Sequence, residues 1–121
     1  MRVIVADDLL AVRSALALLL EQEVDLPVVA QVSDAAGLLQ AVAQVSPDVV
    51  LLDWELPGAS THALVQELRQ NYPQMCIIAL SSRPGAEVAA MLAGVDAFID
   101  KSNPPDALIE RLGQLTPEDR P

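Results

Sequence analysis

Short apolar runs alternate along the chain with segments in which apolar residues recur every three or four positions. The runs are typical of buried strands, and the recurring pattern is typical of helices with one face against a sheet. Five strand and helix pairs are predicted in this way: residues 2–6 and 9–22, 27–32 and 34–45, 48–53 and 59–71, 76–81 and 85–93, and 96–99 and 105–115. This alternation favours right-handed crossovers and a parallel sheet with helices on both faces.

Several residues support the predicted helix ends. Ser33 and Asp34 are natural N-caps for the second helix, and Gly94 is placed to end the fourth. Pro104 and Pro105 can open the fifth helix without losing a needed N–H group. Apolar stripes are predicted on the first helix, from Leu9, Val12, Leu16, Leu19 and Leu20, and on the last, from Leu108, Leu112 and Leu115.

Composition indicates one aliphatic α/β domain. The chain has 121 residues, of which 52% are hydrophobic and only 2% aromatic, so the interior must consist of Val, Leu, Ile and Ala. Residues 1–115 are expected to form the domain. Residues 116–121 have no apolar anchor, and we interpret them as a tail or the start of an interdomain linker.

Charge and cysteine content exclude several classes of function. Seventeen acidic residues against seven basic ones give a net charge of -10, so this domain is not expected to bind nucleic acid. A single cysteine, Cys76, excludes an internal disulfide and agrees with a reducing compartment. The sequence has no signal-peptide pattern and no apolar run of membrane-spanning length, so a cytoplasmic protein without a membrane partner is expected.

Polar side chains follow four of the predicted strands at the point where each ends. Asp7 and Asp8 follow the first strand, Asp53 ends the third, Ser81 ends the fourth, and Lys101 comes two residues after the fifth. The carboxyl ends of parallel strands share one edge of the sheet. Three carboxylates, a hydroxyl and an ammonium are therefore predicted to converge there.

The predicted cluster suits phosphoryl chemistry with a hard cation. Three carboxylates near one another repel, and Mg²⁺ would relieve this while keeping sites for water and phosphate. A carboxylate beside Mg²⁺ can attack phosphorus to form an acyl phosphate. Asp53 is placed for that attack, while Lys101 and Ser81 can hold the phosphoryl oxygens.

The same positions resemble the receiver domain of two-component response regulators over essentially the whole chain. Residues 93–101 are especially similar to receivers of regulators with a LuxR- or NarL-type DNA-binding output. The matched positions are the acidic pair Asp7 and Asp8, the phospho-acceptor Asp53, the hydroxyl residue Ser81, Lys101, and the aromatic Phe98 three residues before it. After Gly58 the chain departs from the usual Asp-Gly pair, and Ser102 stands where a proline is usual.

The resemblance implies a fold and a site. The fold is a flavodoxin-like (βα)5 three-layer sandwich with a parallel sheet in the order 2-1-3-4-5. Asp8 and Asp53 would coordinate Mg²⁺ together with the backbone carbonyl of Glu55, and Asp7 would act mainly through water. Ser81 and Phe98 would be the switch residues. Glu55 and Arg83 would stand at the mouth of the site and pair across it.

The resemblance also implies partners and an output. The phosphoryl donor would be a histidine kinase or a phosphotransfer protein, and the chain would not otherwise be an enzyme. Phosphorylation would promote a homodimer and control transcription through a DNA-binding domain outside this sequence. The fourth predicted helix is almost free of charge, and Val88, Met91 and Leu92 would give it an apolar outer face for a partner or a second copy.

Three other classes of protein share some of these features with the receiver. A phosphohydrolase of the haloacid-dehalogenase type also has an Asp nucleophile and Mg²⁺, but it needs a second Asp where this chain has Glu55. A receiver-shaped binding module that has lost phosphorylation would lack an acid or the lysine, and none is missing. A dinucleotide-binding domain needs glycines after the first strand, and there are none.

Overall fold

The computed structural model describes residues 1–24 and 26–114. One sheet holds five strands: β1 (Val3–Ala6), β2 (Val28–Val32), β3 (Val49–Asp53), β4 (Cys76–Ser81) and β5 (Ala97–Asp100). All neighbouring strands pair in parallel, in the order β2-β1-β3-β4-β5. The predicted parallel sheet and its strand order are confirmed.

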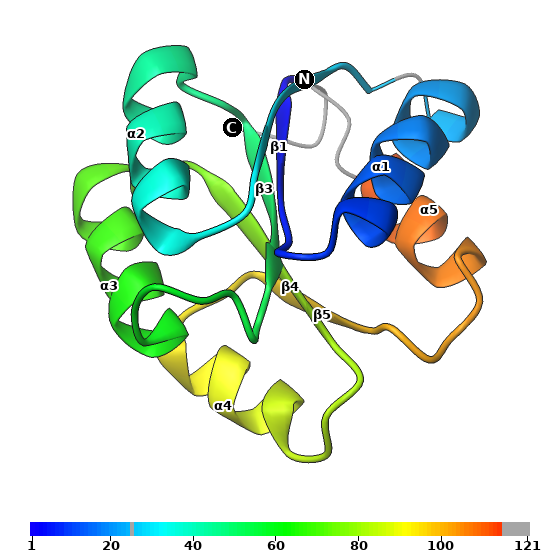
Figure 1. The fold of residues 1–121 in the computed structure, drawn as a ribbon. Helices are drawn as coiled ribbons and strands as arrows, with labels where there is room; N and C mark the ends of the chain where they lie inside the picture. Colours follow the sequence, from blue (N-terminus) through cyan, green and yellow to red (C-terminus); the bar gives the residue numbers. More distant parts are fainter. Residues whose placement is uncertain (25, 115–121) are drawn as a thin grey trace.

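Helices cover both faces of the sheet, which makes three layers (Figure 1). On one face lie α2 (Ala35–Val45), α3 (Thr61–Asn71) and α4 (Ala86–Ala93). On the other lie α1 (Leu10–Leu19), a π-helical turn η1 (Leu20–Val24) and α5 (Asp106–Gly113). The arrangement confirms the flavodoxin-like sandwich, and none of the described helices has the length and apolar character to span a membrane.

The core consists of two aliphatic clusters, one on each face of the sheet. Ile4, Val50 and Ile77 pack in the cluster with α2, α3 and α4, whereas Val5 and Leu51 pack on the opposite face with α1 and α5. Each of these side chains is almost completely buried. Burial on both faces explains why the strands are continuous apolar runs without polar alternation.

The start of the first helix differs from the prediction. Leu9 is its N-cap, in extended conformation, and its side chain is 57% exposed, so it does not belong to a buried stripe. The reason is local, because the Leu9 N–H donates to Oδ1 of Asp7 at 2.9 Å and holds Leu9 outside the helix. The helix also ends earlier than residue 22, since α1 stops at Leu19 and η1 follows.

Most other element ends agree with the predictions within two residues. Asp34 caps α2 by accepting the Gly37 N–H at 2.7 Å, and Gly94 ends α4 with φ of 110°. Pro105 is the N-cap of α5. Leu115 and the expected tail at residues 116–121 lie outside the described residues.

Candidate functional site

The predicted polar residues meet at the carboxyl edge of the sheet. Asp7 follows β1, Asp53 ends β3, Ser81 ends β4, and Lys101 follows β5. In the described part of the chain, the polar or charged residues that are buried are Asp7, Asp53 and Ser81. Because burying polar groups is costly, their concentration at one edge marks a functional site.

An ammonium lies between the two buried carboxylates. Nζ of Lys101 is 2.9 Å from Oδ2 of Asp7 and 3.3 Å from Oδ1 of Asp53. The other Asp7 oxygen accepts the Leu9 N–H, and Oδ1 of Asp53 also accepts the Glu55 N–H at 3.1 Å. Asp7 was expected to act mainly through water on Mg²⁺, and its contact with Lys101 is an addition that sequence spacing does not show.

Burial sets the electrostatics of the site. Desolvation raises the pKa of Asp53, and the negative charge of Asp7 adds to this, although the Glu55 N–H and Lys101 oppose it. Desolvation would lower the pKa of Lys101, but the Asp7 hydrogen bond and the two carboxylate charges outweigh it, so this pKa is raised. Lys101 therefore stays charged and supplies part of the positive charge that the sequence assigned to a metal ion.

The three aspartates are arranged to bind a cation. One oxygen from each of Asp7, Asp8 and Asp53 can be chosen so that all lie within 4.8 Å of one another. Asp8 is exposed, whereas Asp7 and Asp53 are buried. The set therefore consists of hard oxygen ligands with one side open to solvent, which suits Mg²⁺ with retained waters.

The Ser81 hydroxyl is directed to the side chain of Glu55. Its Oγ donates to the Glu55 carboxylate, at 2.8 Å from Oε1 and 3.0 Å from Oε2, and accepts the Arg83 N–H at 3.0 Å. The Glu55 carbonyl was expected to bind Mg²⁺ and its side chain to pair with Arg83, so the hydrogen bond from Ser81 is a contact that the sequence analysis did not predict. The sequence signal was an acid two residues after one strand-terminal residue and a hydroxyl ending the adjacent strand.

Glu55 and Arg83 do stand together at the mouth of the site. Nη1 of Arg83 is 3.9 Å from Oε2 of Glu55, and the Arg83 side chain is 72% exposed. An exposed pair at this separation contributes only about 0–1 kcal/mol. Ser81 is therefore the stronger partner of the Glu55 carboxylate.

Comparison with known proteins identifies the family. The family model of the response regulator receiver domain matches residues 3–113. The chain belongs to this family. Phosphorylation of an aspartate and binding of Mg²⁺ at an acidic cluster are features of receivers, and the three aspartates form such a cluster here.

Several relatives show which receivers are similar. A protein-glutamate methylesterase/protein-glutamine glutaminase of Cereibacter sphaeroides is 34% identical over 78% of this chain and 26% of its own length. The oxygen regulatory protein NreC of Staphylococcus epidermidis is 29% identical over 90% of this chain and 51% of its own. This receiver thus spans about half of one relative and about a quarter of the other.

Among solved structures, LuxR-family response regulators are similar to this chain. A LuxR-family two-component response regulator from Aurantimonas sp. SI85-9A1 has a TM-score of 0.87 and 26% identity, covering 98% of this chain and 86% of that chain. The relatives are mostly transcriptional regulators, although the methylesterase is an enzyme by name. The expected similarity to receivers of LuxR-type regulators is confirmed.

Two aromatic residues lie near the receiver site. Phe98 is partly buried on β5, beside Ala79 in the strand register, and packs against the core. Trp54 follows Asp53 and is partly exposed, and its carbonyl accepts the Thr61 hydroxyl at 2.9 Å. Trp54 is therefore held beside the site, where its fluorescence can report on binding.

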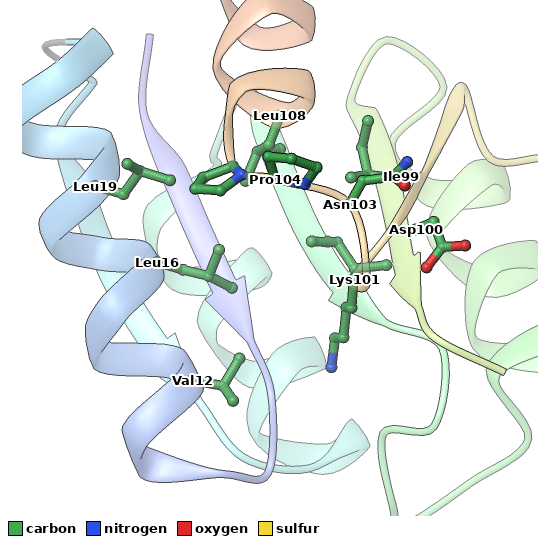
Figure 2. A pocket seen from close by; sticks show the side chains of 11 residues that line it. Val12, Leu16, Leu19, Ile99, Asp100, Lys101, Asn103, Pro104 and Leu108 are labelled. Atoms are coloured by element: carbon green, nitrogen blue, oxygen red, sulfur yellow. The ribbon is translucent and has the colours of Figure 1, made fainter.

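An apolar groove of about 270 Å³ lies between α1 and the start of α5 (Figure 2). Leu16, Leu19 and Leu108 line it. Figure 2 shows Lys101 at its edge, with the ammonium turned away from these leucines. The Lys101 stem therefore contacts apolar surface while its charge reaches the carboxylates, which limits the positions open to the ammonium.

Apolar side chains are exposed on two helices of the receiver. On α4, Val88, Met91 and Leu92 are 65%, 48% and 78% exposed, which confirms the predicted apolar outer face. On α1, Leu10 and Leu18 are also more than half exposed, which the sequence analysis did not anticipate. The receiver thus has two candidate surfaces for a partner.

Proposed function

We propose that this receiver takes its phosphoryl group on Asp53. The observation that carries the proposal is the position of Lys101, whose ammonium lies within 3.3 Å of Asp53 and binds Asp7 on its other side. A cation in this place can hold an oxygen of a phosphoryl group on Asp53. Burial of Asp53 limits the access of water to the product.

The transfer itself needs little covalent chemistry from the protein. A carboxylate oxygen of Asp53 attacks phosphorus, the new O–P bond forms, and the bond from phosphorus to the donor breaks, with the electron pair leaving on the donor. Lys101 and the Ser81 hydroxyl would then contact the phosphoryl oxygens. Asp8, Asp53 and the Glu55 carbonyl, with Asp7 acting mainly through water, would hold Mg²⁺, which offsets negative charge on the transferred group when bound.

The proposal extends to partners and output. The donor would be a histidine kinase or a phosphotransfer protein in the cytoplasm, and the chain would catalyse nothing beyond its own phosphorylation and dephosphorylation. Phosphorylation would promote a homodimer through the apolar face of α4. The receiver would control transcription through a DNA-binding domain outside this sequence. Similarity to NreC and to LuxR-family regulators supports this output.

The alternatives are not favoured. A phosphohydrolase of the haloacid-dehalogenase type would need the residue at position 55 as a free acid at the reacting centre, but Glu55 is hydrogen-bonded to Ser81. A receiver-shaped module without phosphorylation would not need to keep two buried carboxylates and a lysine together at a solvent-facing edge.

A phosphorylation assay tests the proposal. The protein is incubated with Mg²⁺ and a small acyl phosphate donor, and its intact mass is measured. One phosphoryl adduct is expected in the wild type and in Glu67→Gln, an exposed acid on α3, and none in Asp53→Asn. An adduct that persists in Asp53→Asn, or no adduct in the wild type, contradicts the proposal.

A further inference from the structure

The Ser81 hydroxyl has a single proton to donate, and two acceptors can take it: the Glu55 carboxylate and a phosphoryl group on Asp53. We infer that the Glu55 carboxylate competes with a phosphoryl group on Asp53 for this proton, so that Glu55 is a positioning residue that opposes phosphoryl binding. The inference rests on the proposed function, since it takes Asp53 as the phosphorylated residue. It adds a role for the Glu55 side chain to the one proposed for its backbone carbonyl.

The geometry leaves no spare proton. Ser81 is fully buried, and its Oγ donates to the Glu55 carboxylate at 2.8 and 3.0 Å. A hydroxyl can donate only one hydrogen. Its oxygen already accepts the Arg83 N–H at 3.0 Å. Donation to a phosphoryl oxygen therefore requires that the bond to Glu55 is lost.

The competing bond is a strong one. A hydrogen bond from a hydroxyl to an ionised carboxylate is stronger than one between neutral groups. Burial of Ser81 shields this bond from competing water. The Glu55 side chain is 34% exposed, so after release its carboxylate can turn to solvent and need not be left unsatisfied. The Ser81 hydroxyl can therefore leave Glu55 for a phosphoryl oxygen. The lost hydrogen bond reduces the net free energy gained when the phosphoryl group binds.

The same contact extends to the start of α4. The Arg83 N–H donates to Oγ of Ser81, and the Arg83 carbonyl accepts the N–H of Ala86, the first residue of α4, at 3.2 Å. If Oγ of Ser81 itself moves toward Asp53, the Arg83 N–H loses this acceptor and needs another partner. Glu55 therefore holds the segment before α4 in its unphosphorylated arrangement.

A titration with beryllofluoride tests the inference. Trp54 fluorescence is followed as beryllofluoride is added to the protein in saturating Mg²⁺. Glu55→Ala should bind about tenfold tighter than the wild type, equal to about 1.4 kcal/mol. Glu55→Gln, which keeps an acceptor without the charge, should lie between them. Glu67→Ala removes an exposed acid on α3 and should bind as the wild type does.

A double-mutant cycle separates competition from simple charge repulsion. In a Ser81→Ala background there is no proton to compete for, so Glu55→Ala should then change the affinity less than twofold. An equal gain in both backgrounds, or no gain in either, overturns the inference.

Amide exchange without beryllofluoride gives a second test, since Glu55→Ala should speed exchange at Arg83, and an unchanged rate contradicts the link. Failure of the proposed function would be seen separately, as the absence of an Asp53 adduct by mass.

Discussion

The ammonium of Lys101 lies 2.9 Å from a carboxylate oxygen of Asp7, although the two residues are 94 positions apart. The contact joins the segment after β5 to the end of β1, across the ends of the strands between them. It places a positive charge between two buried carboxylates. The metal-free site is therefore partly neutralised by the protein itself.

Replacing Lys101 should destabilise the metal-free protein. Lys101→Met leaves Asp7 and Asp53 buried without their cation, and loss of a charged hydrogen bond costs about 1.5–3 kcal/mol. The free energy of unfolding is measured by urea titration in EDTA. Mg²⁺ should recover more stability in Lys101→Met than in the wild type, since it replaces the missing charge.

Lys101→Arg is the matched control for this prediction. It keeps the positive charge in a planar group with different geometry, so most of the stability in EDTA should remain. Equal stability of Lys101→Met and the wild type in EDTA would show that the ammonium does not stabilise the folded state.

The raised pKa of Asp53 predicts a pH-dependent effect of Asp53→Asn. An acid whose pKa is higher in the folded than in the unfolded state loses folded-state stability as pH rises through that pKa. Without metal, Asp53→Asn should therefore unfold at a higher temperature than the wild type at neutral pH. The advantage should shrink as pH falls through the raised pKa toward the ordinary value of 3.8.

Thermal unfolding in EDTA between about pH 4 and pH 8 measures this difference, because the ordinary pKa of Asp lies at the acidic limit. Glu67→Gln changes charge by the same amount at an exposed position on α3 and should shift stability by no more than about 0.5 kcal/mol. If Asp53→Asn were less stable than the wild type at neutral pH, the Lys101 contact would outweigh desolvation.

Much of the site could be predicted because it depends on topology. Asp7, Asp53 and Ser81 come at the ends of strands that are parallel and adjacent, so their convergence follows once the strand order is known. The buried aliphatic runs predicted the parallel strands, and the resemblance to receiver domains supplied their order. The prediction succeeded for features that depend on where whole strands lie and end.

The remaining features depend on individual side-chain directions. The Ser81 hydroxyl at the end of β4 turns to Glu55 just after the neighbouring strand β3, and the spacing of residues along a chain gives no information on such a choice. The spacing of apolar residues predicts Leu9 in a helical stripe, but the Asp7 side chain holds its N–H outside the helix. The Asp7 bond is a local hydrogen bond that competes with the helix, whereas the Ser81 bond joins residues 26 positions apart.

Mg²⁺ should raise the melting temperature of the unphosphorylated protein, because a ligand that binds only the folded state stabilises it. Asp8→Ala should abolish most of this shift. Asp8 is exposed, so the substitution should cost little stability without metal. Differential scanning fluorimetry with and without Mg²⁺ gives the comparison, with Glu67→Ala as the control. A shift of wild-type size in Asp8→Ala would remove Asp8 from the metal site.

The last prediction distinguishes the two exposed apolar surfaces. If phosphorylation promotes a dimer through α4, beryllofluoride should increase the sedimentation coefficient of the wild type and of Leu18→Lys, but not that of Leu92→Lys. Leu92 is 78% exposed on α4 and Leu18 is 55% exposed on α1, so both variant proteins are expected to fold. Each replaces a leucine with a lysine and changes the net charge equally.

Moderate salt should favour the dimer, because it screens repulsion between two copies of net charge -10. Loss of the dimer in Leu18→Lys alone would assign the interface to α1, and equal sedimentation of the wild type with and without beryllofluoride at high protein concentration would contradict a phosphorylation-dependent dimer.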